Sequence, residues 1–81
     1  MSEHHAFLIE TLRRVIAGGD ISNEELAKAI PDARMLKGAE MKAYLGLSYW
    51  ADDEDIRAKE PEYAPMRREG MVRLLADMGD V

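Results

Sequence analysis

The densest group of side chains that could bind a ligand is the acidic run Asp52-Asp53-Glu54-Asp55. Calcium loops alternate their oxygen ligands, carry glycine at the sixth position and place a glutamate at the twelfth. Counted from Asp52, those two positions hold Arg57 and Tyr63, so the calcium pattern fails. The run is typical of a helix start, where acids favour the positive end of the helix dipole. The alternative is a docking patch for a partner with a basic surface.

Other groups that could catalyse a reaction or hold a metal are sparse. The chain has no cysteine, and its two histidines, His4 and His5, are adjacent, so on a helix they point about 100° apart. Nucleophilic catalysis needs a base beside the nucleophile, and Ser48 has no evident one. No glycine-rich phosphate loop with a lysine is present. We therefore expect no catalytic residue, no metal site and no cofactor.

Residues 22–45 carry the best basic cluster of the chain, which consists of Arg34, Lys37 and Lys42. Two helices around a turn could form a helix-turn-helix here, with Ala27 as the small residue of the first helix. Pro31 stands where such motifs usually have glycine, and Gly38 would loosen the second helix. Two ordinary core helices are the alternative. The net charge of −5 makes the whole chain a poor generic binder of nucleic acid.

The aromatic residues Tyr44, Tyr49 and Trp50 cluster in the sequence. Tryptophan and tyrosine are frequent hot spots of protein interfaces, but they also form the core of small domains. The chain also has six methionines. Their flexible thioether side chains suit either an adaptable partner groove or a thin core. Both interpretations remain open for Trp50 and for the methionines.

The elements that position these residues are predicted to be helices. Leu8, Leu12, Val15 and Ile16 form one helical stripe, so we expect a first helix over residues 3–17, stopped by the glycines at 18 and 19. Ser22 and Glu25 fit a capping box, which predicts a second helix over residues 23–30.

A third helix is expected to begin after an N-cap at Asp32 and to end at Gly46. Gly38 destabilises its middle by about 1 kcal/mol relative to alanine, so this helix is either kinked or begins later. Residues 47–51 are then a short apolar link.

The acidic run opens a fourth helix that ends by residue 60, before Pro61. A last helix takes Pro65 into its first turn and ends at Gly79. Its apolar stripe consists of Met71, Leu74, Leu75 and Met78.

The fold class that follows is all-α, with four to five short helices in a bundle-like or orthogonal array, as one domain over residues 1–81. The first and last helices should touch. The predicted core consists of Leu8, Leu12, Ile16, Leu26, Ile30, Leu45, Trp50, Ile56, Leu74 and Leu75.

The function expected from the sequence is that of a small, non-catalytic adaptor or regulator that binds another protein. The expected contact surface consists of Tyr49, Trp50, Asp52, Asp53, Glu54 and Asp55. A homodimer is a natural corollary, because so short a chain buries little surface by itself. No apolar run is long enough for a membrane span, so we expect a cytoplasmic protein. The alternative function is a DNA-binding transcriptional regulator that uses Arg34, Lys37 and Lys42.

Overall fold

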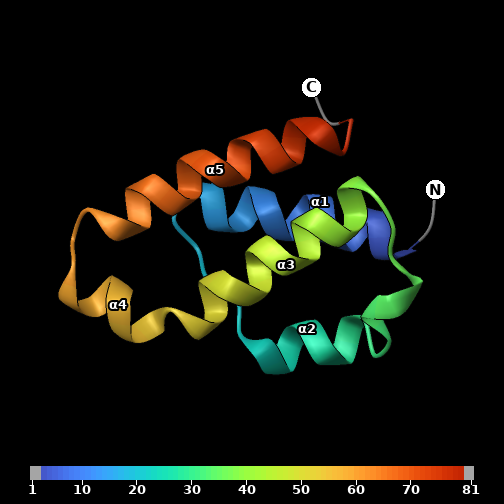
Figure 1. The fold of residues 1–81 in the computed structure, drawn as a ribbon, viewed down its shortest axis with the longest axis horizontal. Coiled ribbons are helices and arrows are strands. Elements are labelled where there is room, and N and C mark those ends of the chain that lie inside the picture. Colours follow the sequence, from blue (N-terminus) through green and yellow to red (C-terminus); the bar gives the residue numbers. More distant parts are fainter. Residues whose placement is uncertain (1–2, 80–81) are drawn as a thin grey trace.

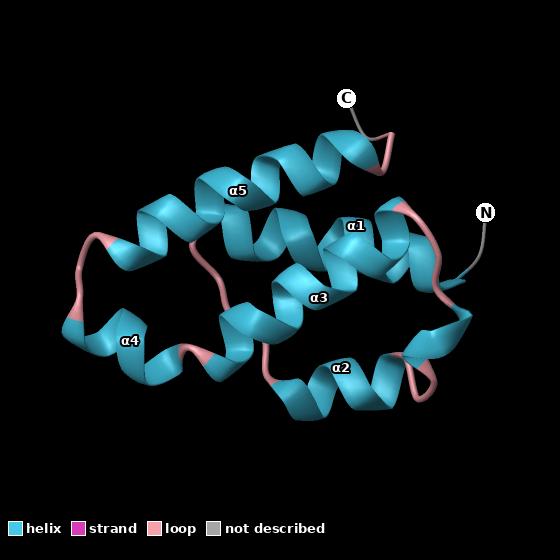
Figure 2. Ribbon diagram, in the orientation of Figure 1, coloured by secondary structure: helices cyan, strands magenta, loops and turns pink. Residues whose placement is uncertain are grey.

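Residues 3–79 are described by a computed structural model, and within them the chain forms helices and no strand (Figure 2). The elements are α1 (Glu3–Ile16), α2 (Asn23–Ala29), a 3-10 helix (Ala33–Met35), α3 (Ala39–Asp52), α4 (Glu54–Lys59) and α5 (Tyr63–Asp77). The predicted all-α class, a bundle-like array of four to five short helices, is confirmed.

The helix α3 runs through the middle of the molecule (Figure 1). It packs against α1, α2 and α5, and α4 continues from its end. The helices α3 and α5 run in opposite directions, and α1 packs against both. The predicted contact between the first and last helices is therefore confirmed. The Cα radius of gyration is 12.0 Å, close to the roughly 11.7 Å of a compact chain of this length.

The first two helices begin and end largely as predicted. Gly18 takes a φ of 107° just after α1, a conformation that glycine adopts without steric penalty. The Ser22 hydroxyl caps α2 by accepting a hydrogen bond of 3.2 Å from the Glu25 amide. The Glu25 carboxylate pairs with Arg14, 3.0 Å away, so it ties α2 to the end of α1.

The third helix begins later than Asp32, which confirms one of its two predicted alternatives, but its end differs from the prediction. Asp32 caps only the short 3-10 helix, and α3 begins after Gly38, whose φ is 58°. The predicted stop at Gly46 is wrong, and the predicted link over residues 47–51 is helical. A tertiary contact explains the glycine, because a Cβ built on Gly46 would lie 2.6 Å from Leu74 Cδ1 on α5. Gly46 therefore lets two helices approach closely.

Prolines delimit the last two helices, as predicted. The helix α4 ends at Lys59, before Pro61, and α5 holds Pro65 in its first turn. Asp53 lies between α3 and α4, so the acidic run joins these two helices and does not simply open one.

The core is formed by one cluster of buried apolar side chains. Predicted members that are buried are Leu8, Leu12, Leu26, Ile30 and Trp50; predicted members that are half-buried are Ile16, Leu74 and Leu75. Leu45 and Ile56 are wrong predictions, because they are 40% and 41% exposed. Since α3 continues past Gly46, its buried stripe consists of Ala43, Leu47 and Trp50, and Leu45 falls outside that stripe.

None of the helices in residues 3–79 combines the length and the apolar character that crossing a membrane requires.

Candidate functional site

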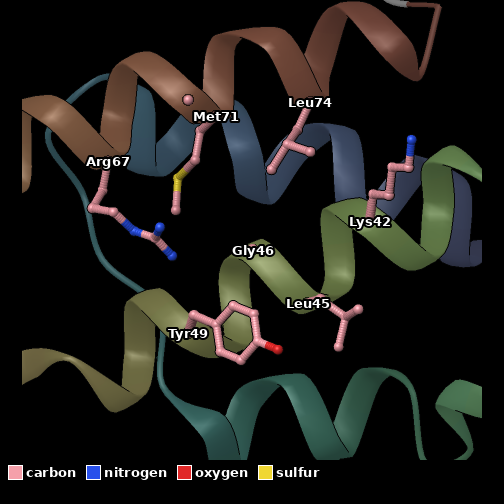
Figure 3. A pocket seen from close by; sticks show the side chains of 8 residues that line it. Lys42, Leu45, Gly46, Tyr49, Arg67, Met71 and Leu74 are labelled. Atoms are coloured by element: carbon pink, nitrogen blue, oxygen red, sulfur yellow. The ribbon is translucent and has the colours of Figure 1, made fainter.

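An apolar groove of about 330 Å³ lies between α3 and α5 (Figure 3). We call it the α3/α5 groove. It is lined by Lys42, Leu45, Gly46 and Tyr49 from α3 and by Arg67, Gly70, Met71 and Leu74 from α5. Both sets follow the spacing i, i+3, i+4, i+7, which places four residues on one face of a helix. Each helix therefore contributes about two turns, or about 10 Å of length, to the groove.

Two glycines inside the helices keep side chains out of the α3/α5 groove, for different reasons. Gly46 is needed by the fold, because Leu74 lies where its Cβ would be. Gly70 is not, since a Cβ built there meets no atom within 4 Å. Glycine in a helix interior costs about 1 kcal/mol relative to alanine. Gly70 lines the groove, and a side chain placed there would meet open space, so no packing against the rest of the described chain requires a glycine.

Apolar side chains on the α3 side of the groove are exposed. Leu45 is 40% exposed and Tyr49 is 54% exposed. On the α5 side, Met71 is buried and Leu74 is half-buried, so they form the floor. A concave apolar surface with exposed rims is the usual form of a binding site for a ligand or a partner chain.

The charged residues that line the α3/α5 groove are both cations, although the chain carries a net charge of −5. Lys42 and Arg67 form no ion pair within residues 3–79. The Arg67 guanidinium instead lies 5.9 Å from the centre of the Tyr63 ring. Because α3 and α5 run in opposite directions, the two cations stand at opposite ends of the groove (Figure 3).

The predicted aromatic pair is divided by the structure. Tyr49 lines the groove, whereas Trp50 is 1% exposed and belongs to the core. Successive residues of a helix point about 100° apart, so both cannot face the same side of α3. Trp50 supports α3 from within and offers almost no surface to a partner.

The acidic run is partly used inside the molecule. Asp52 accepts a hydrogen bond from the Asn23 side-chain amide, and Asp53 accepts one from the Tyr63 hydroxyl. The Asp53 carboxylate raises the pKa of that hydroxyl above its usual range, because it binds the protonated form. Glu54 and Asp55 remain exposed at the start of α4.

A second cluster of polar groups surrounds Asp20, in the loop between α1 and α2. Its Oδ1 accepts hydrogen bonds from the Trp50 indole at 2.7 Å, the Ile21 amide at 2.8 Å and Arg57 at 3.1 Å. Burial opposes ionisation of Asp20, but these three donors outweigh it and hold its pKa below the usual value. Arg57 and Arg68 also lie over the Trp50 ring, at 4.2 and 5.1 Å.

This Asp20 cluster faces two shallow hollows of about 430 and 310 Å³. The polar atoms in it already bind one another, and Arg68 donates to the Val15 carbonyl at 3.0 Å. We therefore interpret the cluster as a set of structural contacts that hold the α1–α2 loop, α3, α4 and α5 together. We do not interpret it as a ligand site.

The basic residues of the DNA-binding alternative do not share one helix. Arg34 lies in the 3-10 helix and pairs with Asp32 at 3.0 Å, and Lys37 precedes α3. Lys42 lies on α3 at the groove. Residues 30–38 separate α2 from α3, whereas a helix-turn-helix joins its helices by three or four residues.

Within residues 3–79, no group of three or more histidine, cysteine, aspartate or glutamate side chains gathers where it could hold a metal ion. His5 lies 3.5 Å from the Glu40 carboxylate, which links the start of α1 to the start of α3.

The sequence interpretation missed the α3/α5 groove. Its signal was present as the matching spacing of residues 42, 45, 46, 49 and 67, 70, 71, 74. That spacing could be recognised only if Gly46 was placed inside a helix.

Comparison of this chain with protein-family models, with curated proteins and with solved structures found no match.

Proposed function

We propose that this protein is a small, non-catalytic binding module that captures another protein in the α3/α5 groove. The observation that carries the proposal is the open space over Gly70, beside Leu45 and Tyr49. A glycine that weakens its helix and serves no contact within residues 3–79 has an explanation if a partner fills the space.

The groove supports this role better than the acidic run does. Two of the four acids, Asp52 and Asp53, already accept hydrogen bonds from within the chain. The groove, in contrast, offers apolar surface from Leu45 and Tyr49 and two cations that form no ion pair within residues 3–79. Apolar and aromatic anchors in a concave surface supply most of the free energy of protein binding. Tyr49 is the residue that the expected contact surface and the groove share.

The DNA-binding alternative has less support. Its three basic residues lie on different elements, and residues 30–38 are too long for the turn of the motif. Measured affinity for random duplex DNA that falls when Arg34, Lys37 and Lys42 are neutralised would restore that alternative.

The test blocks the groove without disturbing the fold. In Gly70→Leu, the new Cβ enters open space in the middle of α5, and leucine favours a helix more than glycine does, so the variant should fold at least as stably as the wild type. The matched control is Val72→Leu, on the same helix but outside the groove, at a side chain that is 50% exposed. Circular dichroism and thermal unfolding check the fold of both variants.

A random peptide library displayed on phage is selected on the wild type. The proposal expects enriched peptides that bind the wild type and Val72→Leu equally and bind Gly70→Leu at least tenfold more weakly. Amide shifts in two-dimensional NMR should map to the eight lining residues. Enriched peptides that bind Gly70→Leu as well as the wild type would contradict the proposal, as would a selection that enriches no peptide.

A further inference from the structure

We infer that the occupant of the α3/α5 groove is a partner helix with an acidic residue at each end of a short apolar patch, in the pattern acid-x-x-apolar-apolar-x-x-acid. The inference rests on the proposed function and names the chemistry of the partner. It is carried by the spacing of the groove residues and by the sign and position of their charges.

The shape of the groove favours a helix. Its two walls are antiparallel helices, each exposing about two turns, and its open length is about 10 Å. A helix laid in such a groove inserts the side chains at i, i+3, i+4 and i+7 of one face. A strand would need an exposed sheet edge to pair with, and residues 3–79 contain no strand.

The positive charges of the groove favour a partner helix with an acidic residue on each side of its apolar pair. Lys42 and Arg67 stand at opposite ends, and neither has a carboxylate partner within residues 3–79. Carboxylates seven residues apart on a helix lie about 10 Å apart along its axis, which matches the length of groove between the level of Lys42 and the level of Arg67. The two apolar residues between them would then lie over Gly70 and the floor formed by Met71 and Leu74. Such complementary charges fix the register and orientation of a bound helix.

Two copies of this chain packed groove to groove fit poorly. In a two-fold dimer on this face, each end of the groove meets either the same end or the opposite end of the groove in the other copy. Both ends carry a cation, so cations would face cations in either arrangement. Exposed acids lie on several helices of the chain. Those of α4 are accompanied by one exposed large apolar side chain, Ile56, so α4 lacks the apolar pair that the pattern requires. At the start of α5, Glu62, Pro65, Met66 and Glu69 are exposed and have the required spacing, so sedimentation velocity is needed to test a second copy that offers this segment.

The test uses three alanine-based helical peptides that differ only in their flanks. They contain Glu-x-x-Leu-Leu-x-x-Glu, the same core with Gln flanks, or the same core with Lys flanks. Affinity is measured by fluorescence anisotropy at low salt and at 0.5 M salt. The Glu peptide should bind roughly tenfold more tightly than the Lys peptide at low salt, since each exposed ion pair contributes modestly, and this ratio should shrink at high salt.

The reciprocal experiment reverses the charges of the protein and measures binding of the same three peptides. In the double variant Lys42→Glu/Arg67→Glu, the order of the peptides should invert, so that the Lys peptide binds most tightly. The control Lys37→Glu/Arg73→Glu makes the same change of net charge at exposed positions outside the groove and should keep the wild-type order. Inversion in the first variant and not in the second assigns the selectivity to the two groove cations.

The outcomes separate this inference from the proposed function. Equal binding of the three peptides, all weakened by Gly70→Leu, would overturn the acidic flanks and leave the groove as a binding site. No binding by any peptide would overturn the helical partner, and the phage selection would then decide the proposed function. Sedimentation velocity tests whether a second copy of the chain occupies the groove. A concentration-dependent dimer that Gly70→Leu disperses, and that Val72→Leu does not, would make another copy of the chain the occupant and overturn the inference.

Discussion

The Trp50 indole N–H donates a hydrogen bond of 2.7 Å to Oδ1 of Asp20, a residue of the loop between α1 and α2. Trp50 is almost fully buried, and its indole nitrogen is a donor only. Asp20 is therefore the group that satisfies this donor, and the bond fixes the loop against the middle helix.

Replacing Asp20 with alanine should lower the free energy of unfolding by about 1–3 kcal/mol, because it leaves the buried indole N–H without an acceptor. Urea denaturation measures the change, and Glu69→Ala, an exposed acid of α5, is the control. In a Trp50→Phe background the donor is absent, so the same Asp20→Ala change should be markedly less destabilising. Equal losses in both backgrounds would show that the bond contributes nothing.

Asp20 should also contribute to acid sensitivity. Its pKa is lower in the folded chain than in the unfolded chain, so its contribution to stability is complete above the unfolded value of about 3.9. That contribution is lost as the pH falls further, through the folded pKa. The difference in unfolding free energy between the wild type and Asp20→Asn should therefore be constant near pH 7 and shrink below pH 4. A difference that stays constant down to pH 2 would contradict this prediction.

The two helical glycines should respond differently to alanine. Gly70→Ala should stabilise the chain by up to about 1 kcal/mol, which raises the melting temperature by about 4–8 °C, because the new methyl group meets nothing. Gly46→Ala should gain less, since its methyl group must displace the end of the Leu74 side chain. Thermal unfolding of both variants gives the comparison. In a Leu74→Ala background the two gains should become similar, and a persistent difference would point to another cause.

The cap of α2 gives a further prediction. Ser22→Ala should destabilise the chain by about 0.5–2 kcal/mol, because the Glu25 amide loses its acceptor. Ser22→Asp keeps an acceptor at the same position and should retain most of the stability. Guanidinium denaturation of the three proteins measures both changes, and a loss of similar size in Ser22→Asp would argue against capping as the cause.

Local signals in the sequence were sufficient for the ends of several helices. The cap at Ser22, the glycine after α1 and the prolines near α4 and α5 act through their own backbone geometry or nearest amides. The helical periodicity of the apolar residues predicted the fold class, and the apolar stripes of the first and last helices predicted their contact. They required no knowledge of what lies across the core.

The errors arise where a distant residue decides the outcome. Glycine often ends a helix, and nothing near Gly46 in sequence shows that Leu74 will pack over it. Ending the third helix there placed Leu45 in the core and Tyr49 in a link. The same error concealed the groove, because its α3 wall exists only when residues 42–49 are one continuous helix.

The candidate site was predicted only in part for the same reason. Tyr49, a predicted contact residue, lines the groove, but its neighbour Trp50 is buried and bonded to Asp20, and two of the four acids bind Asn23 and Tyr63. These partners belong to loops and helices remote in sequence, so residue type and spacing alone could not separate exposed acids from occupied ones.

The open space over Gly70 also makes this position suitable for attaching a fluorescent label. The sequence contains no cysteine. A Gly70→Cys substitution would therefore introduce a single thiol, at the groove glycine where a built Cβ meets open space in the described structure. An environment-sensitive dye attached there would report directly on whatever enters the groove, without competing labelling elsewhere in the chain.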